Sequence, residues 1–143
     1  MKSIKKFLFV MAALAAVCSF VSCSSDDDGP KTVAVYEDDF LAPLYIETLT
    51  LYDDGTFKNV GTVAGEKFTA ATGTYKGDVT KDTDADNKVT YTVKKIMGWE
   101  FKLISIEEYV EMSGEDLKDY TDAPATIKDG VLYCKFGEYK LKK

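Results

Sequence analysis

The chain has 143 residues and a formal net charge of −6, and its length suits one domain of ordinary size. It contains no histidine, which excludes His-dependent triads, imidazole zinc ligands and the usual general base near neutral pH. All 18 basic residues are lysine, and an acidic chain without arginine is a poor candidate for nucleic-acid binding.

The first 22 residues are typical of an export signal. An apolar stretch over residues 7–17 follows a short basic segment that holds Lys2, Lys5 and Lys6. This stretch is too short for a stable membrane-spanning helix, but it suits the hydrophobic region of a signal peptide. We therefore assign residues 1–22 to a signal peptide.

The signal ends in Phe20-Val21-Ser22-Cys23, where a small residue directly precedes a cysteine. This pattern resembles the lipobox of bacterial lipoproteins. The resemblance implies that the peptide is cut before Cys23, that the thiol is diacylglycerylated, and that the new amino terminus is acylated, with palmitate a typical chain. Several acyl chains would make a permanent membrane anchor. The alternatives are an ordinary secretory signal cut near Ser22 and an uncleaved anchor.

Residues 23–30 continue as a short acidic tether that ends in Gly29-Pro30 and carries too little apolar surface to fold. The acidic run resembles the surface-export signal of Bacteroidetes-type lipoproteins, and a plain linker is the alternative. We expect a lipid anchor in the outer membrane, facing the periplasm or the exterior. Cleavage after residue 22 would remove three lysines, so the mature chain would carry a net charge of −9. Its folded domain, residues 31–143, holds only Cys134, which excludes an internal disulfide.

The folded domain is dominated by a period of two, which indicates half-buried strands. Val89, Tyr91 and Val93 share one face of such a run, and Asp53-Asp54-Gly55 is typical of a tight hairpin turn. We predict about eight strands: 32–39, 45–52, 56–63, 66–72, 74–79, 88–96, 99–106 and 131–141. The last strand allows a break at Gly137, with a further short strand near residues 125–128.

One stretch departs from this pattern. Residues 107–120 favour a short helix, and Ser113 to Asp116 has the form of a capping box. Many short strands joined by hairpins indicate an antiparallel meander. Closure into a barrel removes the exposed edges of such a sheet. The predicted fold class is therefore all-β, a meander closed into a small barrel of about eight strands.

The run Thr48 to Phe57, with its Asp-Asp-Gly-Thr-Phe turn, resembles the hairpin of small lipocalin-like bacterial lipoproteins. Gly73-Thr74-Tyr75 stands where their next strand begins, and Asp129-Gly130 fits their late hairpin. The resemblance implies a lipocalin-like barrel. The Gly-x-Trp of true lipocalins is missing from the first strand, since the single tryptophan is Trp99.

A barrel of eight strands is just wide enough to be filled by side chains or to hold one small ligand. Amphipathic aromatic side chains suit a pocket for a small hydrophobic molecule. The candidates for ligand binding are Tyr75, Tyr91, Trp99, Phe101 and Tyr133. The alternative is that these rings simply fill the interior.

Asp82, Asp84 and Asp86 place oxygens at alternate positions, as at the start of a calcium loop. The glycine and the final acidic residue of an EF-hand loop are absent. Two interpretations of this segment therefore stay open, a weak calcium site and a solvated hairpin tip. The carboxylates around residues 107–116 favour a solvated face over catalysis, and no nucleophile elbow, Walker loop or dinucleotide motif occurs. We expect no catalytic residues, no cofactor and no metal site.

The sequence thus predicts a membrane-anchored, non-enzymatic lipoprotein whose lipocalin-like domain binds a small hydrophobic ligand. The alternatives are a protein-binding module, either an inhibitor or an envelope assembly partner, and a weakly calcium-dependent surface protein.

Overall fold

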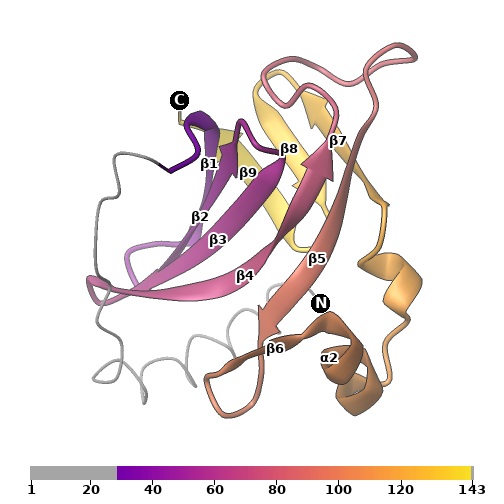
Figure 1. Cartoon of the computed structure of the whole chain (residues 1–143). Helices are drawn as coiled ribbons and strands as arrows, with labels where there is room; N and C mark the ends of the chain where they lie inside the picture. Colours follow the sequence, from indigo (N-terminus) through magenta and orange to yellow (C-terminus); the bar gives the residue numbers. More distant parts are fainter. Residues whose placement is uncertain (1–28, 143) are drawn as a thin grey trace.

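The computed structural model describes residues 29–142 of the chain (Figure 1). The predicted signal peptide, the predicted lipidation site Cys23 and most of the predicted tether lie outside these residues. Within the described part, no helix is long and apolar enough to cross a membrane.

The described chain forms nine strands with one short α-helix and one 3₁₀ turn between the sixth and seventh strands. In chain order the elements are β1 (Thr32–Leu41), β2 (Tyr45–Tyr52), β3 (Thr56–Val63), β4 (Glu66–Lys76), β5 (Val89–Met97), β6 (Leu103–Ser105), α2 (Ile106–Ser113), η2 (Leu117–Asp119), β7 (Ala123–Lys128), β8 (Val131–Cys134) and β9 (Gly137–Leu141).

The strands form one antiparallel sheet that closes on itself. Its order is β4-β3-β2-β1-β9-β8-β7-β5-β6, and a further pairing of β4 with β5 joins the two ends of the row into a barrel. The barrel has eight strands, because β6 pairs only with the end of β5, outside the ring. The predicted all-β meander, closed into a barrel with one short helix, is confirmed.

The alternating pattern explains why these segments form barrel strands. Along β5, Val89, Tyr91 and Val93 are buried, while the residues between them are more exposed. The predicted Asp-Gly turn joins β2 to β3, where Gly55 adopts a positive φ of 82° that suits glycine. Ala64-Gly65 joins β3 to β4 and the expected Asp129-Gly130 turn joins β7 to β8, and both glycines also have a positive φ.

The prediction of two strands separated at Gly73 was wrong, since β4 runs unbroken from Glu66 to Lys76. A Cβ on Gly73 would lie 2.0 Å from the carbonyl oxygen of Thr92 and 2.8 Å from the Phe57 ring. The glycine therefore permits a close approach of β4 to β5 within the sheet, where the register also shifts.

Two further predictions need correction. The strand expected over residues 99–106 shrinks to the three residues of β6, because residues 98–102 form a turn in which Phe101 has a φ of 59°. The capping box also lies elsewhere. Ser105 caps α2 and accepts a hydrogen bond from the backbone N–H of Glu108, whereas Asp116 caps only the 3₁₀ turn η2.

The core consists of two clusters along the barrel. The larger fills the middle and the end near the β2–β3 turn, and includes Tyr36, Val93 and Tyr139. The smaller lies at the opposite end and consists of Tyr45, Val63, Phe68, Ala70 and Met97. This second cluster fills the barrel where the β1–β2 and β3–β4 turns project.

Candidate functional site

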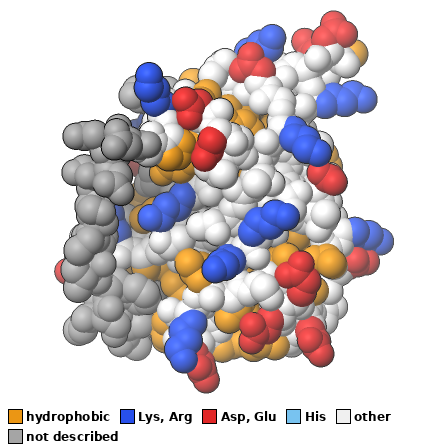
Figure 2. All heavy atoms as spheres, in the orientation of Figure 1, with side chains coloured by type: hydrophobic (Ala, Val, Ile, Leu, Met, Phe, Trp, Pro, Cys, Tyr) orange, Lys and Arg blue, Asp and Glu red, His pale blue; other side chains and the backbone are white. Residues whose placement is uncertain are grey.

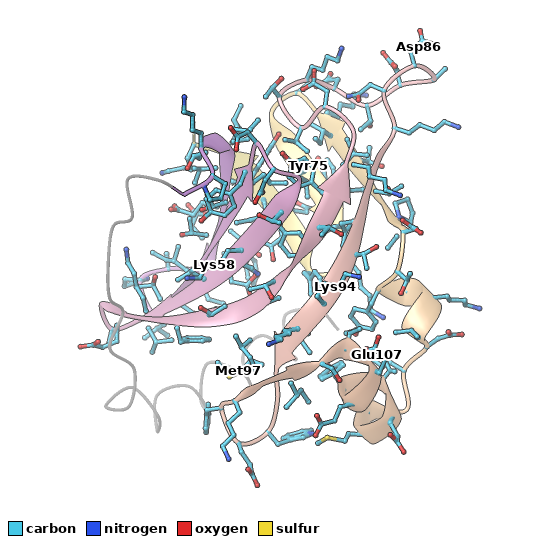
Figure 3. All side chains as sticks on the ribbon, viewed as in Figure 1. Lys58, Tyr75, Asp86, Lys94, Met97 and Glu107 are labelled. Atoms are coloured by element: carbon cyan, nitrogen blue, oxygen red, sulfur yellow. The ribbon has the colours of Figure 1, made fainter. Side chains whose placement is uncertain are left out.

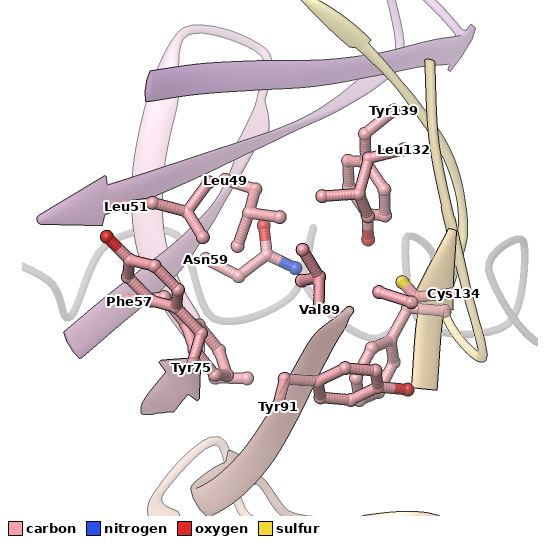
Figure 4. A pocket seen from close by; sticks show the side chains of 13 residues that line it. Leu49, Leu51, Phe57, Asn59, Tyr75, Val89, Tyr91, Leu132, Cys134 and Tyr139 are labelled. Atoms are coloured by element: carbon pink, nitrogen blue, oxygen red, sulfur yellow. The ribbon is translucent and has the colours of Figure 1, made fainter. Parts of the chain in front are cut away.

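A small cavity lies inside the barrel, within the larger core cluster (Figure 4). Its volume is about 40 Å³, and a single water molecule needs roughly 10–15 Å³. Thirteen residues line it: Leu49, Leu51, Phe57, Asn59, Ala71, Tyr75, Val89, Tyr91, Ala125, Leu132, Cys134, Phe136 and Tyr139. Almost all present aliphatic or aromatic surface, which makes this the natural place for an apolar guest.

The lining follows directly from the alternation of the strands. Leu49 and Leu51 are two residues apart on β2, as are Val89 and Tyr91 on β5, so each pair points to the same side of the sheet. The cavity thus draws on β2, β3, β4, β5, β7, β8 and β9 together with Phe136 of the β8–β9 turn. No single strand could supply it, and only barrel closure brings these residues together.

Tyr75 and Tyr91 turn their rings to the cavity while hydrogen bonds hold their hydroxyl groups in the wall. The Tyr75 hydroxyl donates to the carbonyl of Tyr52 at 2.6 Å, and the Tyr91 hydroxyl accepts from the backbone N–H of Lys135 at 3.3 Å. Burial raises the pKa of both phenols above the ordinary value of 10, with Tyr91 affected more strongly. Both phenol groups are therefore neutral at physiological pH, and both rings present uncharged surface to the cavity.

The structure brings together only two of the five aromatic candidates. Tyr75 and Tyr91 line the cavity, whereas Tyr133 lies on the outward face of β8 and is 41% exposed. Trp99 is 79% exposed in the turn between β5 and β6, and Phe101 packs against the second core cluster. The presence of an aromatic ring does not tell which of these residues face the cavity. Trp99 and Phe101 belong to a turn that we predicted to be a strand.

Exposed apolar side chains gather at the end of the barrel that holds the second cluster. Trp99 and Leu103 flank the β5–β6 turn, Phe40 and Leu44 flank the β1–β2 turn, and Met112 lies near the end of α2. Figure 2 shows hydrophobic side chains on the lower part of this face, with acidic side chains among them. Nothing in the described chain covers these side chains.

A buried carboxylate next to the cavity was not predicted. Glu47 is 8% exposed and accepts hydrogen bonds from the hydroxyls of Tyr45, at 2.9 Å, and Tyr139. The side-chain amide of Asn59 also donates to it, at 3.2 Å. Burial is the largest cause that raises the pKa of the Tyr45 and Tyr139 phenols, and the charge of Glu47 adds to it.

Asn59 itself is 6% exposed, and its Oδ1 is buried without a hydrogen-bond partner among the described residues. The acceptor-only carboxylate of Glu47 requires a donor, which fixes the orientation of the Asn59 amide. The sequence did contain a signal for this group. Phe57, Asn59 and Gly61 alternate along β3, and a polar side chain on a face that is otherwise apolar marks a buried polar contact.

The acidic residues of the β4–β5 loop accept backbone hydrogen bonds within the loop and from the β7–β8 turn. Asp84 Oδ1 accepts from the backbone N–H groups of Asp86 and Asn87, both at 2.8 Å, and Asp82 Oδ1 accepts from that of Asp129 at 2.9 Å. Asp86 lies at the far tip of the loop, away from the barrel (Figure 3). Between residues 29 and 142, no three acidic or cysteine side chains come together as metal ligands do.

The loop is held over its end of the barrel by buried contacts. Val79 is 1% exposed and its carbonyl accepts a hydrogen bond of 2.7 Å from the Tyr36 hydroxyl. The buried side chain of Asn87 bridges the loop, accepting from Asp78 N at 2.9 Å and donating to the carbonyls of Asp78 and Asp82. The loop therefore lies over this end of the barrel, and the second cluster fills the opposite end.

Comparison of the chain with models of known protein families, with curated proteins and with solved structures finds no match.

Proposed function

We propose that this protein is a non-enzymatic, lipid-anchored protein of the outer membrane whose barrel binds a compact apolar molecule. The observation that carries the binding proposal is the cavity, because it lies within the larger core cluster and is lined almost entirely by apolar side chains. Cavities of this kind stay dry and accept small apolar guests.

The size of the cavity restricts the ligand. A volume of about 40 Å³ suits a small, compact group and excludes a long acyl chain unless the lining side chains move. Five of the lining side chains carry aromatic rings, namely Phe57, Tyr75, Tyr91, Phe136 and Tyr139. A compact ligand that contacts ring faces fits this arrangement better than a flexible chain does.

The anchor is proposed from the sequence. The basic start, the apolar stretch of residues 7–17 and the small residue before Cys23 support export and lipidation. Lys31 begins the folded part and is fixed beside the β2–β3 turn, where its backbone exchanges hydrogen bonds with Asp53 at 2.8 and 3.0 Å. Eight residue steps from Cys23 to Lys31 span at most about 27 Å, which keeps the barrel close to the membrane.

Xenon provides a direct test of binding, because it is apolar and compact. We expect dissolved xenon to shift the methyl resonances of Leu49, Val89 and Leu132 in NMR spectra of the full chain in mild detergent. Ala125→Val adds two carbon atoms at the cavity wall and should abolish these shifts. Thr126→Val, on the exposed face of the same strand, is the matched control and should leave them unchanged.

Absence of the shifts in the unmodified protein, or equal shifts in both variants, would refute binding inside the barrel. The natural ligand can then be sought by native mass spectrometry of protein purified from its own membranes, as a bound mass that Ala125→Val loses. For the anchor, Cys23→Ala should release the protein from the membrane fraction. An unmodified residue 23 in mass spectra of the mature protein would contradict the proposal.

A further inference from the structure

The barrel wall has a gap beside β5. On one edge β5 pairs with β7 only from Val89 to Tyr91, and with β6 only from Lys95 to Met97. Between these pairings, residues 92–94 have no strand neighbour on that edge within the described chain. The gap lies directly after Tyr91, one of the residues that line the cavity.

A short segment outside the barrel covers this gap. Residues 114–122, which we call the gate segment, connect α2 to β7 (Figure 1). The carbonyl of Tyr120 accepts a hydrogen bond of 2.8 Å from the backbone N–H of Val93, in the place that a strand would occupy. The backbone N–H of Asp122 donates to the Thr92 hydroxyl at 3.0 Å.

Aromatic rings link the gate segment to the cavity. The Tyr120 ring is buried and lies 6.1 Å from the Phe136 ring, which in turn lies 6.2 Å from Tyr91. Phe136 and Tyr91 line the cavity, whereas Tyr120 stands one layer further out. Displacement of Tyr120 would therefore leave Phe136 free to swing and open a lateral path to the ligand space.

Lys135 fastens the gate segment to the β8–β9 turn. Its ammonium group lies 3.5 Å from a carboxylate oxygen of Glu115 and 3.3 Å from one of Asp119. It also lies 4.3 Å from the centre of the Tyr120 ring, where the cation meets the ring face. The Lys135 side chain is 31% exposed and that of Glu115 20%, so salt screens this contact less than it screens a fully exposed pair.

We propose that the gate segment is the lateral gate of the barrel and that Lys135 is its latch, so that opening of the segment admits and releases the ligand. This inference rests on the proposed function for the ligand, but the gate motion itself has a readout of its own. Few backbone hydrogen bonds hold the gate segment, whereas continuous ladders hold the barrel, and segments of this kind open locally at low free-energy cost.

The backbone N–H of Val93 reports the gate without any ligand, because its hydrogen-bond acceptor belongs to the gate segment. Lys135→Met removes both ion pairs and the ring contact while keeping the backbone N–H that donates to Tyr91. We expect this variant to speed hydrogen exchange at the backbone N–H of Val93 about tenfold, because it loses the two ion pairs and the cation–π contact that hold the segment closed. The double variant Glu115→Gln and Asp119→Asn cuts the same latch from the other side and should act alike.

Lys118→Met is the matched control. It removes the same charge from the gate segment itself, but among the described residues the Lys118 ammonium pairs with the exposed Asp116, at 3.3 Å, and not with Glu115 or Asp119. Exchange at Val93 should stay unchanged in this variant, and exchange at the β2–β3 ladder should stay unchanged in all of them. Equal acceleration at Val93 and in the β2–β3 ladder would mean general destabilisation, and no acceleration in either latch variant would mean no latch. Either result overturns the proposal.

Xenon separates the gate from the binding function. In the latch variants xenon should enter and leave about tenfold faster while its dissociation constant stays the same, because a gate changes both rates equally. Unchanged xenon exchange rates alongside faster exchange at Val93 would show that the segment moves but is not the ligand path, which overturns the inference. A protein that binds no xenon at all would instead refute the proposed function and leave the Val93 result to decide the gate motion.

Discussion

Alkaline pH should unfold this barrel cooperatively. Five tyrosines are at most 8% exposed, and the pKa of the phenol is raised most strongly in four of them, Tyr45, Tyr91, Tyr120 and Tyr139. Burial is in each case the largest cause that raises the pKa of the phenol above its ordinary value of 10. For Tyr45, Tyr120 and Tyr139 a neighbouring carboxylate, Glu47 or Glu115, raises it further.

The sign follows from proton linkage. Below pH 10 the phenols are protonated in both the folded and the unfolded chain, so these groups do not make the free energy of unfolding depend on pH. Above pH 10 the unfolded chain releases these protons while the folded chain keeps them, so the free energy of unfolding falls as pH rises. By pH 11 each of these phenols lowers the free energy of unfolding by about 1.4 kcal/mol, and the four together lower it by about 6 kcal/mol. That is comparable with the whole stability of a domain of this size.

The assay follows tyrosinate absorbance and far-ultraviolet circular dichroism through the same titration. We expect the buried phenols to ionise only as the β signal disappears, between about pH 10.5 and 11.5. Tyr91→Phe removes one of the four groups and should reduce the slope of the free energy of unfolding by about 1.4 kcal/mol per pH unit. Ionisation of all tyrosines while the β signal persists would refute the reasoning.

Three further predictions concern stability and are checked by urea unfolding. Gly73→Ala should cost about 3 kcal/mol or prevent folding, because the new Cβ would lie 2.0 Å from the carbonyl oxygen of Thr92. Gly98→Ala meets only the end of a flexible side chain at 2.9 Å, and a cost equal to that of Gly73→Ala would contradict the distinction. Asn87→Ala should cost about 2–3 kcal/mol, since the backbone groups that it pairs lose their partners in the loop over the barrel end; a cost below about 0.5 kcal/mol would show that water replaces it. Ser105→Ala should cost about 1 kcal/mol as the loss of a helix cap, whereas Ser113→Ala, at the other end of α2, should cost much less.

The barrel could be predicted from the sequence because its signal is local and repeated. Alternation placed Val89, Tyr91 and Val93 on one inward face, and Asp-Gly turns located the β2–β3 and β7–β8 hairpins. The same alternation put Leu132, Cys134 and Phe136 on one side, and all three line the cavity. Period and turn chemistry are properties of a few consecutive residues, so they survive without any knowledge of tertiary contacts.

The errors arose where the structural role of a residue depends on contacts with a distant part of the chain. Gly73 was read as a break, but it serves the close approach of Thr92 across the sheet. Trp99 was placed in the pocket because it is aromatic, although its turn projects beyond the barrel. Alternation along β3 marks Asn59 as a buried polar side chain, but it does not identify Glu47 on the neighbouring strand as its partner. The gate segment is equally non-local, since the gap that it covers exists only once β5 and β7 have paired.

The closing pairs of the barrel set the order in which the chain can complete its fold. β1 pairs with β9 through Tyr36 and Leu141, which lie near opposite ends of the described chain. Because this pairing requires β9, β1 keeps one open edge until the whole barrel domain has been synthesised. Contacts between such distant residues slow folding and leave the edge available for wrong pairing. The edge of β1 is therefore protected from aggregation only once β9 has paired with it.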